Sequence, residues 1–185
     1  MHAHIGWILM FSAVATVSFA ADGTFFADAA RAGAAEVALG RLAESRGSTD
    51  AVKQFGRQMA ADHEASGSKL KAAAAKSGVE LPTGLTVEAQ ATQRQLQALT
   101  GRDFDLAYLE SQRKAHAKTI GLLEKEIASG ADSAAKAWAR EALPTVQRHA
   151  EMIGNVGEPP GEHDVEHAAG TAGPADAPRV GETPR

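Results

Sequence analysis

The chain has 185 residues, a formal net charge of −4 and no cysteine. The lack of cysteine excludes disulfides, thiol catalysis and thiolate metal sites, and the mildly acidic balance argues against nucleic acid as a partner, which would require a clustered basic face. Apolar residues make up 44% of the chain but aromatic residues only 5%, and the abundance of alanine favours helices over strands.

The first predicted element is a secretory signal peptide over residues 1–20. An uncharged apolar run from Ile5 to Val17 is followed by Ser18 and Ala20, which place small side chains at the positions that signal peptidase reads. Because the run is short for a bilayer span, we expect cleavage after Ala20, a periplasmic or secreted protein, and no transmembrane domain in the mature chain. Residues 1–4 contain no Lys or Arg, so a retained N-terminal anchor is the alternative.

Four long helices and one short helix are predicted next. Each long segment carries one apolar stripe at steps of three and four residues, which is the spacing of an amphipathic helix. Breaks that contain glycine separate the segments, and no segment alternates with the period of two that predicts a sheet. The predicted helices cover about residues 24–46, 50–77, 87–99, 103–128 and 133–154.

The connections between these helices predict how they are arranged. The first two long helices are joined by two or three residues, as are the last two, so each pair should be an antiparallel hairpin. About two dozen residues, including the short helix, lie between the pairs, which is long enough to return along the bundle. The predicted fold is therefore all-α: a ferritin-like four-helix bundle with a short crossover helix, over residues 21–156.

The C-terminal segment, residues 157–185, has a different composition. It is rich in proline and glycine and nearly lacks large apolar side chains. Such a segment buries too little surface to offset the entropy lost on ordering, so we predict a disordered tail.

A candidate metal site arises from histidines on the apolar stripes. His63, His116 and His149 lie on three different long helices, and Glu36 lies at the core edge of the remaining one. With the predicted crossover, the rise per residue places all four at a similar height in the bundle. Imidazole and carboxylate suit Zn, Fe or Cu, so these four residues could bind one ion, with Asp62 as a partner of the ligands or a competing ligand.

A simpler interpretation of the same residues is at least as well supported by spacing alone. Buried histidines are often hydrogen-bonded core residues, and the three could form a polar layer with Glu36 and Gln112. Three functions therefore stay open: a non-enzymatic metal-binding bundle, which we favour over an enzyme; a mononuclear-metal enzyme; and a structural module that binds an envelope protein. The enzyme hypothesis predicts an open coordination position and a pocket beside His149.

Several segments resemble the bacterial exported family catalogued as domain of unknown function 4142. The segments are FADAARAGAAEVALGRL at residues 26–42, FGRQMAADH at 55–63, LPT at 81–83, LTGRDFDLAYL at 99–109 and ALPTVQRH at 142–149, together with His116. The resemblance covers about residues 24–156 and implies a ferritin-like helical bundle in an exported bacterial protein. Members are often labelled outer-membrane proteins, so outer-membrane association is a further expectation, and the family brings no established activity.

One feature of metal-using ferritin-like proteins is missing. Those proteins carry paired Glu-x-x-His elements. In this chain the residues three positions before His63, His116 and His149 are Ala60, Arg113 and Val146. A di-iron carboxylate centre is therefore not expected.

Overall fold

The computed structural model describes residues 15–157, and within that range it contains five helices and no strand. The helices are α1 (Ala15–Arg46), α2 (Asp50–Lys76), α3 (Val87–Gln97), α4 (Gly101–Ser129) and α5 (Ser133–Gly157). The predicted all-α fold is confirmed. Helix α1 begins at Ala15, earlier than predicted, and so includes the end of the predicted signal peptide. Most of the predicted signal peptide and almost all of the predicted tail lie outside the described residues.

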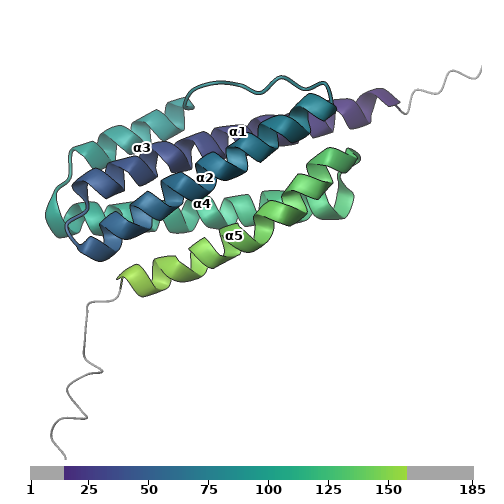
Figure 1. Cartoon of the computed structure of the whole chain (residues 1–185). Helices are drawn as coiled ribbons and strands as arrows, with labels where there is room; N and C mark the ends of the chain where they lie inside the picture. Colours follow the sequence, from purple (N-terminus) through teal and green to yellow (C-terminus); the bar gives the residue numbers. More distant parts are fainter. Residues whose placement is uncertain (1–14, 158–185) are drawn as a thin grey trace, which may run out of the picture.

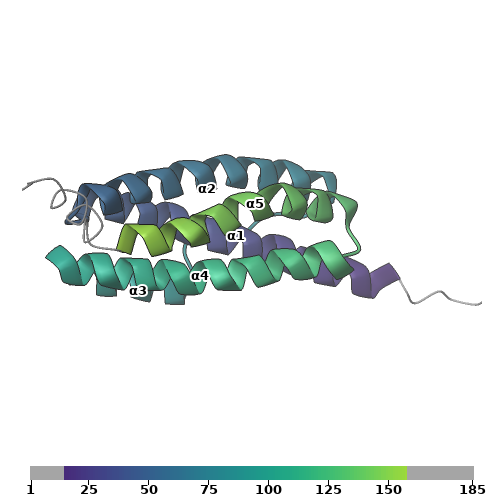
Figure 2. The same ribbon diagram turned by 90° about the horizontal axis from the view of Figure 1, so that it is seen from below.

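The helices form two antiparallel hairpins, α1–α2 and α4–α5, joined by a long crossover (Figure 1). The crossover returns along the bundle, and its helix α3 packs outside the four long helices, against α1 and α4. As a result α4 begins at the end of the bundle where α1 turns into α2. Figure 2 shows α2 along one side and α4 with α3 along the other, while α5 runs obliquely from beside α2 towards α4. This is the topology that the connection lengths predict.

Local sequence signals explain where the helices begin and end. The side chains of Thr49 and Thr86 cap α2 and α3 by accepting hydrogen bonds from the backbone N–H groups of Val52 and Ala89, at 3.2 and 3.1 Å. Gly78 follows α2 with a φ of 68°, the left-handed conformation that ends many helices. These caps fix the lengths of the helices, and therefore the heights of the residues that they carry.

The buried carboxyl group of Asp105 connects α4 to the turn between α1 and α2. It accepts hydrogen bonds from both the backbone N–H, at 2.8 Å, and the hydroxyl of Ser48. This contact joins the two hairpins at the end of the bundle where α4 begins.

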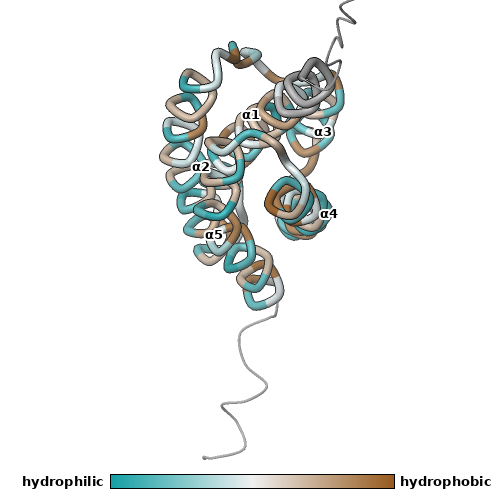
Figure 3. Tube along the Cα trace, turned by 90° about the vertical axis from the view of Figure 1, so that its right-hand side faces the viewer, coloured by the Kyte–Doolittle hydropathy of each residue, from teal (hydrophilic) through white to brown (hydrophobic). Residues whose placement is uncertain are grey.

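The core consists of two apolar clusters at different heights. One cluster surrounds Phe26, Leu70 and Trp138, and the other surrounds Phe55 and Phe104. On each long helix a polar residue lies between the residues that contribute to the two clusters; these residues are Glu36, His63, Gln112 with His116, and His149. The end-on view in Figure 3 shows the helices that enclose this core, coloured by hydropathy. A polar layer thus crosses the middle of the bundle.

Helices α1 and α2 pack unusually closely at two glycines. A Cβ atom added at Gly40 would lie 2.7 Å from the carbonyl oxygen of Gly56, and one added at Gly56 would lie 2.7 Å from the carbonyl oxygen of Gly40. Any side chain at either position would push the two backbones apart. The first hairpin therefore depends on both glycines.

Among residues 15–157, no helix combines the length and the apolar character that crossing a membrane requires.

Candidate metal centre

Three imidazole rings from three helices meet in the polar layer. His63 comes from α2, His116 from α4 and His149 from α5. Their ring centroids form a nearly equilateral triangle with sides of 5.5, 5.6 and 5.9 Å. One nitrogen from each ring lies within 4.8 Å of the corresponding nitrogens of the other two. These three side chains, which were predicted to lie at similar heights, therefore meet in one layer.

The triangle is close to the geometry that one ion requires. Rings bound to one tetrahedral zinc through Zn–N bonds of about 2.0–2.1 Å have centroids roughly 5 Å apart and ligating nitrogens about 3.3 Å apart. The nitrogens would therefore approach one another by up to about 1.5 Å on binding, which small side-chain rotations can provide. No helix has to move far for the three rings to reach a common ion.

A backbone contact orients His116. Its Nδ1 lies 2.9 Å from the carbonyl oxygen of Gln112, one turn earlier on α4. Because a carbonyl can only accept, Nδ1 carries the proton and Nε2 keeps its lone pair. Nε2 is buried and has no hydrogen-bond partner. This is the tautomer that can bind a metal through Nε2.

A carboxyl group orients His149. Its Nε2 lies 2.8 Å from Oδ2 of Asp62 on α2, so Nε2 donates to the carboxylate and Nδ1 keeps the lone pair. Nδ1 is buried and unpartnered. A carboxylate that accepts from the distal nitrogen of a metal-binding histidine is the usual way in which proteins orient such a ligand. Sequence analysis placed Asp62 beside the ligands as a neighbour of His63, but the hydrogen bond joins it to a residue on another helix.

Burial keeps the three rings neutral, which is the form that binds metals. It lowers the pKa of His63 to about 3, with smaller contributions from the nearby His149 and His116. It lowers the pKa of His116 to about 4, although the Gln112 carbonyl opposes the change. Burial also lowers the pKa of His149, and its hydrogen bond to Asp62 opposes that change. The Nε2 atom of His63 is buried and unpartnered as well, so each ring has a buried nitrogen without a hydrogen-bond partner.

Glu36 is in the polar layer but outside this group. Sequence analysis predicted it as a fourth ligand, yet its carboxylate is not among the atoms that converge. It is buried beside Gln112, and burial raises its pKa to about 7, which the Gln112 amide opposes only in part. The proximity of Glu36 adds to the effect of burial in raising the pKa of Tyr108. Glu36 therefore belongs to a second polar group formed with α4.

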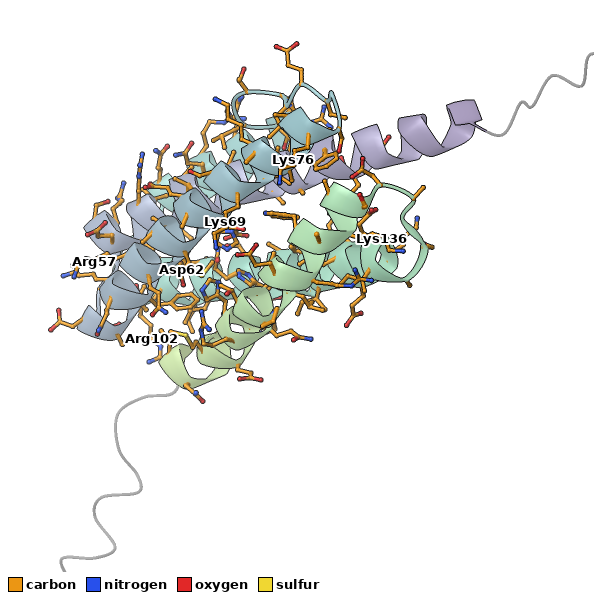
Figure 4. The ribbon with its side chains drawn as sticks, turned by 45° about the vertical axis from the view of Figure 1, so that its right-hand side comes forward. Arg57, Asp62, Lys69, Lys76, Arg102 and Lys136 are labelled. Carbon is orange, nitrogen blue, oxygen red and sulfur yellow. The ribbon has the colours of Figure 1, made fainter. Side chains whose placement is uncertain are left out.

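A pocket of about 210 Å³ lies between α2 and α5 and reaches two of the three histidines. The residues that line it include His63, His149 and Asp62, together with Ser66, Lys69, Trp138, Glu141 and Thr145. Figure 4 shows Asp62 and Lys69 on the side of α2 that faces α5. The pocket beside His149 that the enzyme hypothesis predicts is present.

The other residues that line this pocket were not predicted from the sequence, although the spacing of two of them indicates it. Ser66 follows His63 by three residues and Thr145 precedes His149 by four, and these spacings put each pair on one helix face. Lys69 and Glu141 have no such spacing to the histidines. Only the packing of α2 against α5 brings them to the pocket.

Comparison with known proteins identifies a family for this chain, but that family has no described activity. The model of the family described as Domain of unknown function (DUF4142) matches residues 11–156. No curated protein and no solved structure matches the chain. Since the family model covers most of the sequence, including all three histidines, the chain belongs to this family of unknown function.

Proposed function

We propose that this protein binds one transition-metal ion in the core of its bundle through His63, His116 and His149. One observation carries the proposal: three neutral imidazoles converge, and each presents a buried nitrogen that has no hydrogen-bond partner. A buried polar atom without a partner lowers stability. Glu36, Gln112 and Tyr108 also have buried atoms without a partner, but among the described residues it is the three histidines that converge as ligands of one ion would. Metal coordination would satisfy all three atoms at once.

The donor set narrows the choice of metal. Three neutral imidazoles suit zinc, copper and iron, whereas calcium and magnesium prefer oxygen ligands. The second ring nitrogens of His116 and His149 donate hydrogen bonds to the Gln112 carbonyl and to Asp62. These bonds would hold the two rings in place whichever of these ions binds. We therefore propose Zn, Cu or Fe as the bound metal.

Metal loading of the full chain tests the proposal. After incubation with Zn²⁺, Cu²⁺ or Fe²⁺ and removal of the excess, elemental analysis is expected to find one ion per chain. At a free metal concentration 100 times Kd, binding should raise the free energy of unfolding by about 2.7 kcal/mol. His63→Ala and His116→Ala should lose both effects, while Glu36→Gln, a change at another buried group of the same layer, should keep them. A wild-type chain that retains none of the three metals would exclude the proposal.

Asp62 should strengthen binding without touching the ion. Asp62→Ala removes the acceptor that orients His149, and we expect metal affinity to fall about 10- to 100-fold. Glu64→Ala is the matched control, because Glu64 is the other acidic neighbour of His63 in the sequence and forms an exposed ion pair with Arg41. Competition titrations with a chelating dye measure both affinities. Equal affinities for the two variants would mean that Asp62 has no such role.

We also propose that the protein acts in the bacterial cell envelope. The apolar run and small residues of segment 1–20 support export. Cell fractionation followed by intact-mass measurement should find a chain that begins at Ala21 outside the cytoplasm. A full-length cytoplasmic product would contradict export.

A further inference from the structure

The pocket between α2 and α5 borders the histidine cluster at two of its three rings. His63 and His149 are among its lining residues, whereas His116 is not. Its volume of about 210 Å³ is several times the space of one water molecule, roughly 30 Å³ in the liquid. A ligand of a few heavy atoms would fit beside the rings.

The walls of the pocket are held by contacts between the helices. The indole N–H of Trp138 on α5 donates to the carbonyl oxygen of Ser66 on α2 at 3.2 Å. At the outer rim, Lys69 on α2 forms an exposed ion pair with Glu141 on α5. These two charges offset each other, so the rim favours neither sign of ligand.

The charge of the proposed ion therefore decides which sign of charge a ligand in the pocket should carry. Three neutral imidazoles leave a divalent ion with its full double charge, because none of the three ligands is an anion. The carboxylate of Asp62 already accepts a hydrogen bond from His149, and Glu36 does not belong to the group formed by the three histidines. Three protein ligands with an open fourth position are typical of zinc sites that bind water or substrate. An anion at that position would offset charge in a largely buried site.

We infer that the fourth coordination position faces the pocket between α2 and α5 and binds a small anion with a nitrogen or oxygen donor. The inference rests on the proposed metal site. It assigns the pocket as the route by which the anion reaches the ion, and it gives the protein a binding activity beyond storing the metal.

Azide binding to the Co²⁺-loaded full chain tests the inference, because the visible bands of Co²⁺ respond to a change of ligand. Saturable changes are expected as azide is added. Ser66→Phe fills the pocket and should keep Co²⁺ while weakening azide binding by at least about tenfold. Ser68→Phe, on the exposed face of the same helix, should behave as wild type. Thr145→Leu, on the opposite wall, repeats the test should Ser66→Phe not fold.

The outcomes separate this inference from the proposed function. Co²⁺ binding with no response to azide, or an equal response in the wild type and both pocket-filling variants, would overturn the inference and leave the metal site standing. A response that appears only in Glu36→Gln would mean that Glu36 is the fourth ligand, which also overturns it. Failure to bind Co²⁺, together with the loading results above, would instead remove the metal site itself.

Discussion

Acidifying the metal-free protein from pH 7 to pH 4 is expected to lower its free energy of unfolding by about 3 kcal/mol. The histidines set this direction. Their pKa values in the folded chain lie below the ordinary value of 6.5, at about 3 for His63 and about 4 for His116, and lower than usual for His149. As pH falls below 6.5, the unfolded chain takes up protons that the folded chain cannot. His63 and His116 each contribute a loss of about 3 kcal/mol by pH 4.

Glu36 acts in the opposite direction. Burial raises its pKa from 4.5 to about 7, so the folded chain holds a proton that the unfolded chain releases above pH 4.5. Stability from this group is fully present below pH 4.5 and is lost as pH rises through 7. Acidification to pH 4 therefore restores about 3 kcal/mol. Because the three histidines together lower the free energy of unfolding by more than Glu36 restores, acidification leaves a net loss of stability.

Urea unfolding at both pH values in the presence of a chelator measures this balance. Glu36→Gln should be more stable than wild type at pH 7 and should lose about 6 kcal/mol on acidification, because the opposing group is gone. Glu151→Gln, a change at an exposed carboxyl group of α5, should follow the wild type. Unfolding free energies that stay constant or rise between pH 7 and pH 4 would show that the histidines are not buried as neutral rings.

Alanine at Gly40 or Gly56 is expected to destabilise the protein by about 2 kcal/mol or more. The new Cβ at Gly40 would meet the backbone at Gly56 and Ala60, and the one at Gly56 would meet the backbone at Gly40 and Glu44, all at 2.7–2.9 Å. Backbone atoms cannot rotate away as a side chain can, so α1 and α2 must separate. The gain in helix propensity, about 0.5–1 kcal/mol for Gly to Ala, is too small to compensate.

Two other glycines of the same helices provide matched controls. A Cβ at Gly33 on α1 or at Gly67 on α2 would meet nothing within 4 Å. Gly33→Ala and Gly67→Ala should therefore stabilise the protein by about 0.5–1 kcal/mol. The same substitution is thus expected to change the free energy of unfolding in opposite directions, which thermal or urea denaturation can measure. Equal effects at all four positions would mean that the close approach of α1 and α2 is absent.

Much of the fold, and the meeting of the three histidines, could be predicted from the sequence. Apolar spacing identified the helices, and the connection lengths gave two hairpins with a crossover. The constant rise of 1.5 Å per residue then turned sequence positions into heights. His63, His116 and His149 also lie on apolar stripes, which fixed the inward direction of their side chains. Height and direction together were enough to place the rings in one layer.

For Glu36, the height in the bundle could be predicted in the same way, but the direction of its side chain could not. Glu36 lies beside the inward stripe of α1 and not on it, so a modest rotation of the helix decides what it faces. That rotation depends on the close packing of Gly40 on Gly56, which is a tertiary contact. In the structure Glu36 lies near Gln112 and Tyr108 of α4. The contact between Asp62 and His149 was beyond prediction for a similar reason, because spacing along one helix does not specify a side-chain partner on another.

The distribution of the three histidines has a mechanical consequence. His63 belongs to the first hairpin, and His116 and His149 belong to the second. An ion held by all three would act as a cross-link at mid-height and would close the long crossover into a loop, which restricts the unfolded chain as a disulfide does. Amide exchange in α2 and α5 should then slow together when metal is added. In a chain without cysteine, such an ion would do what covalent bridges do in many small secreted domains.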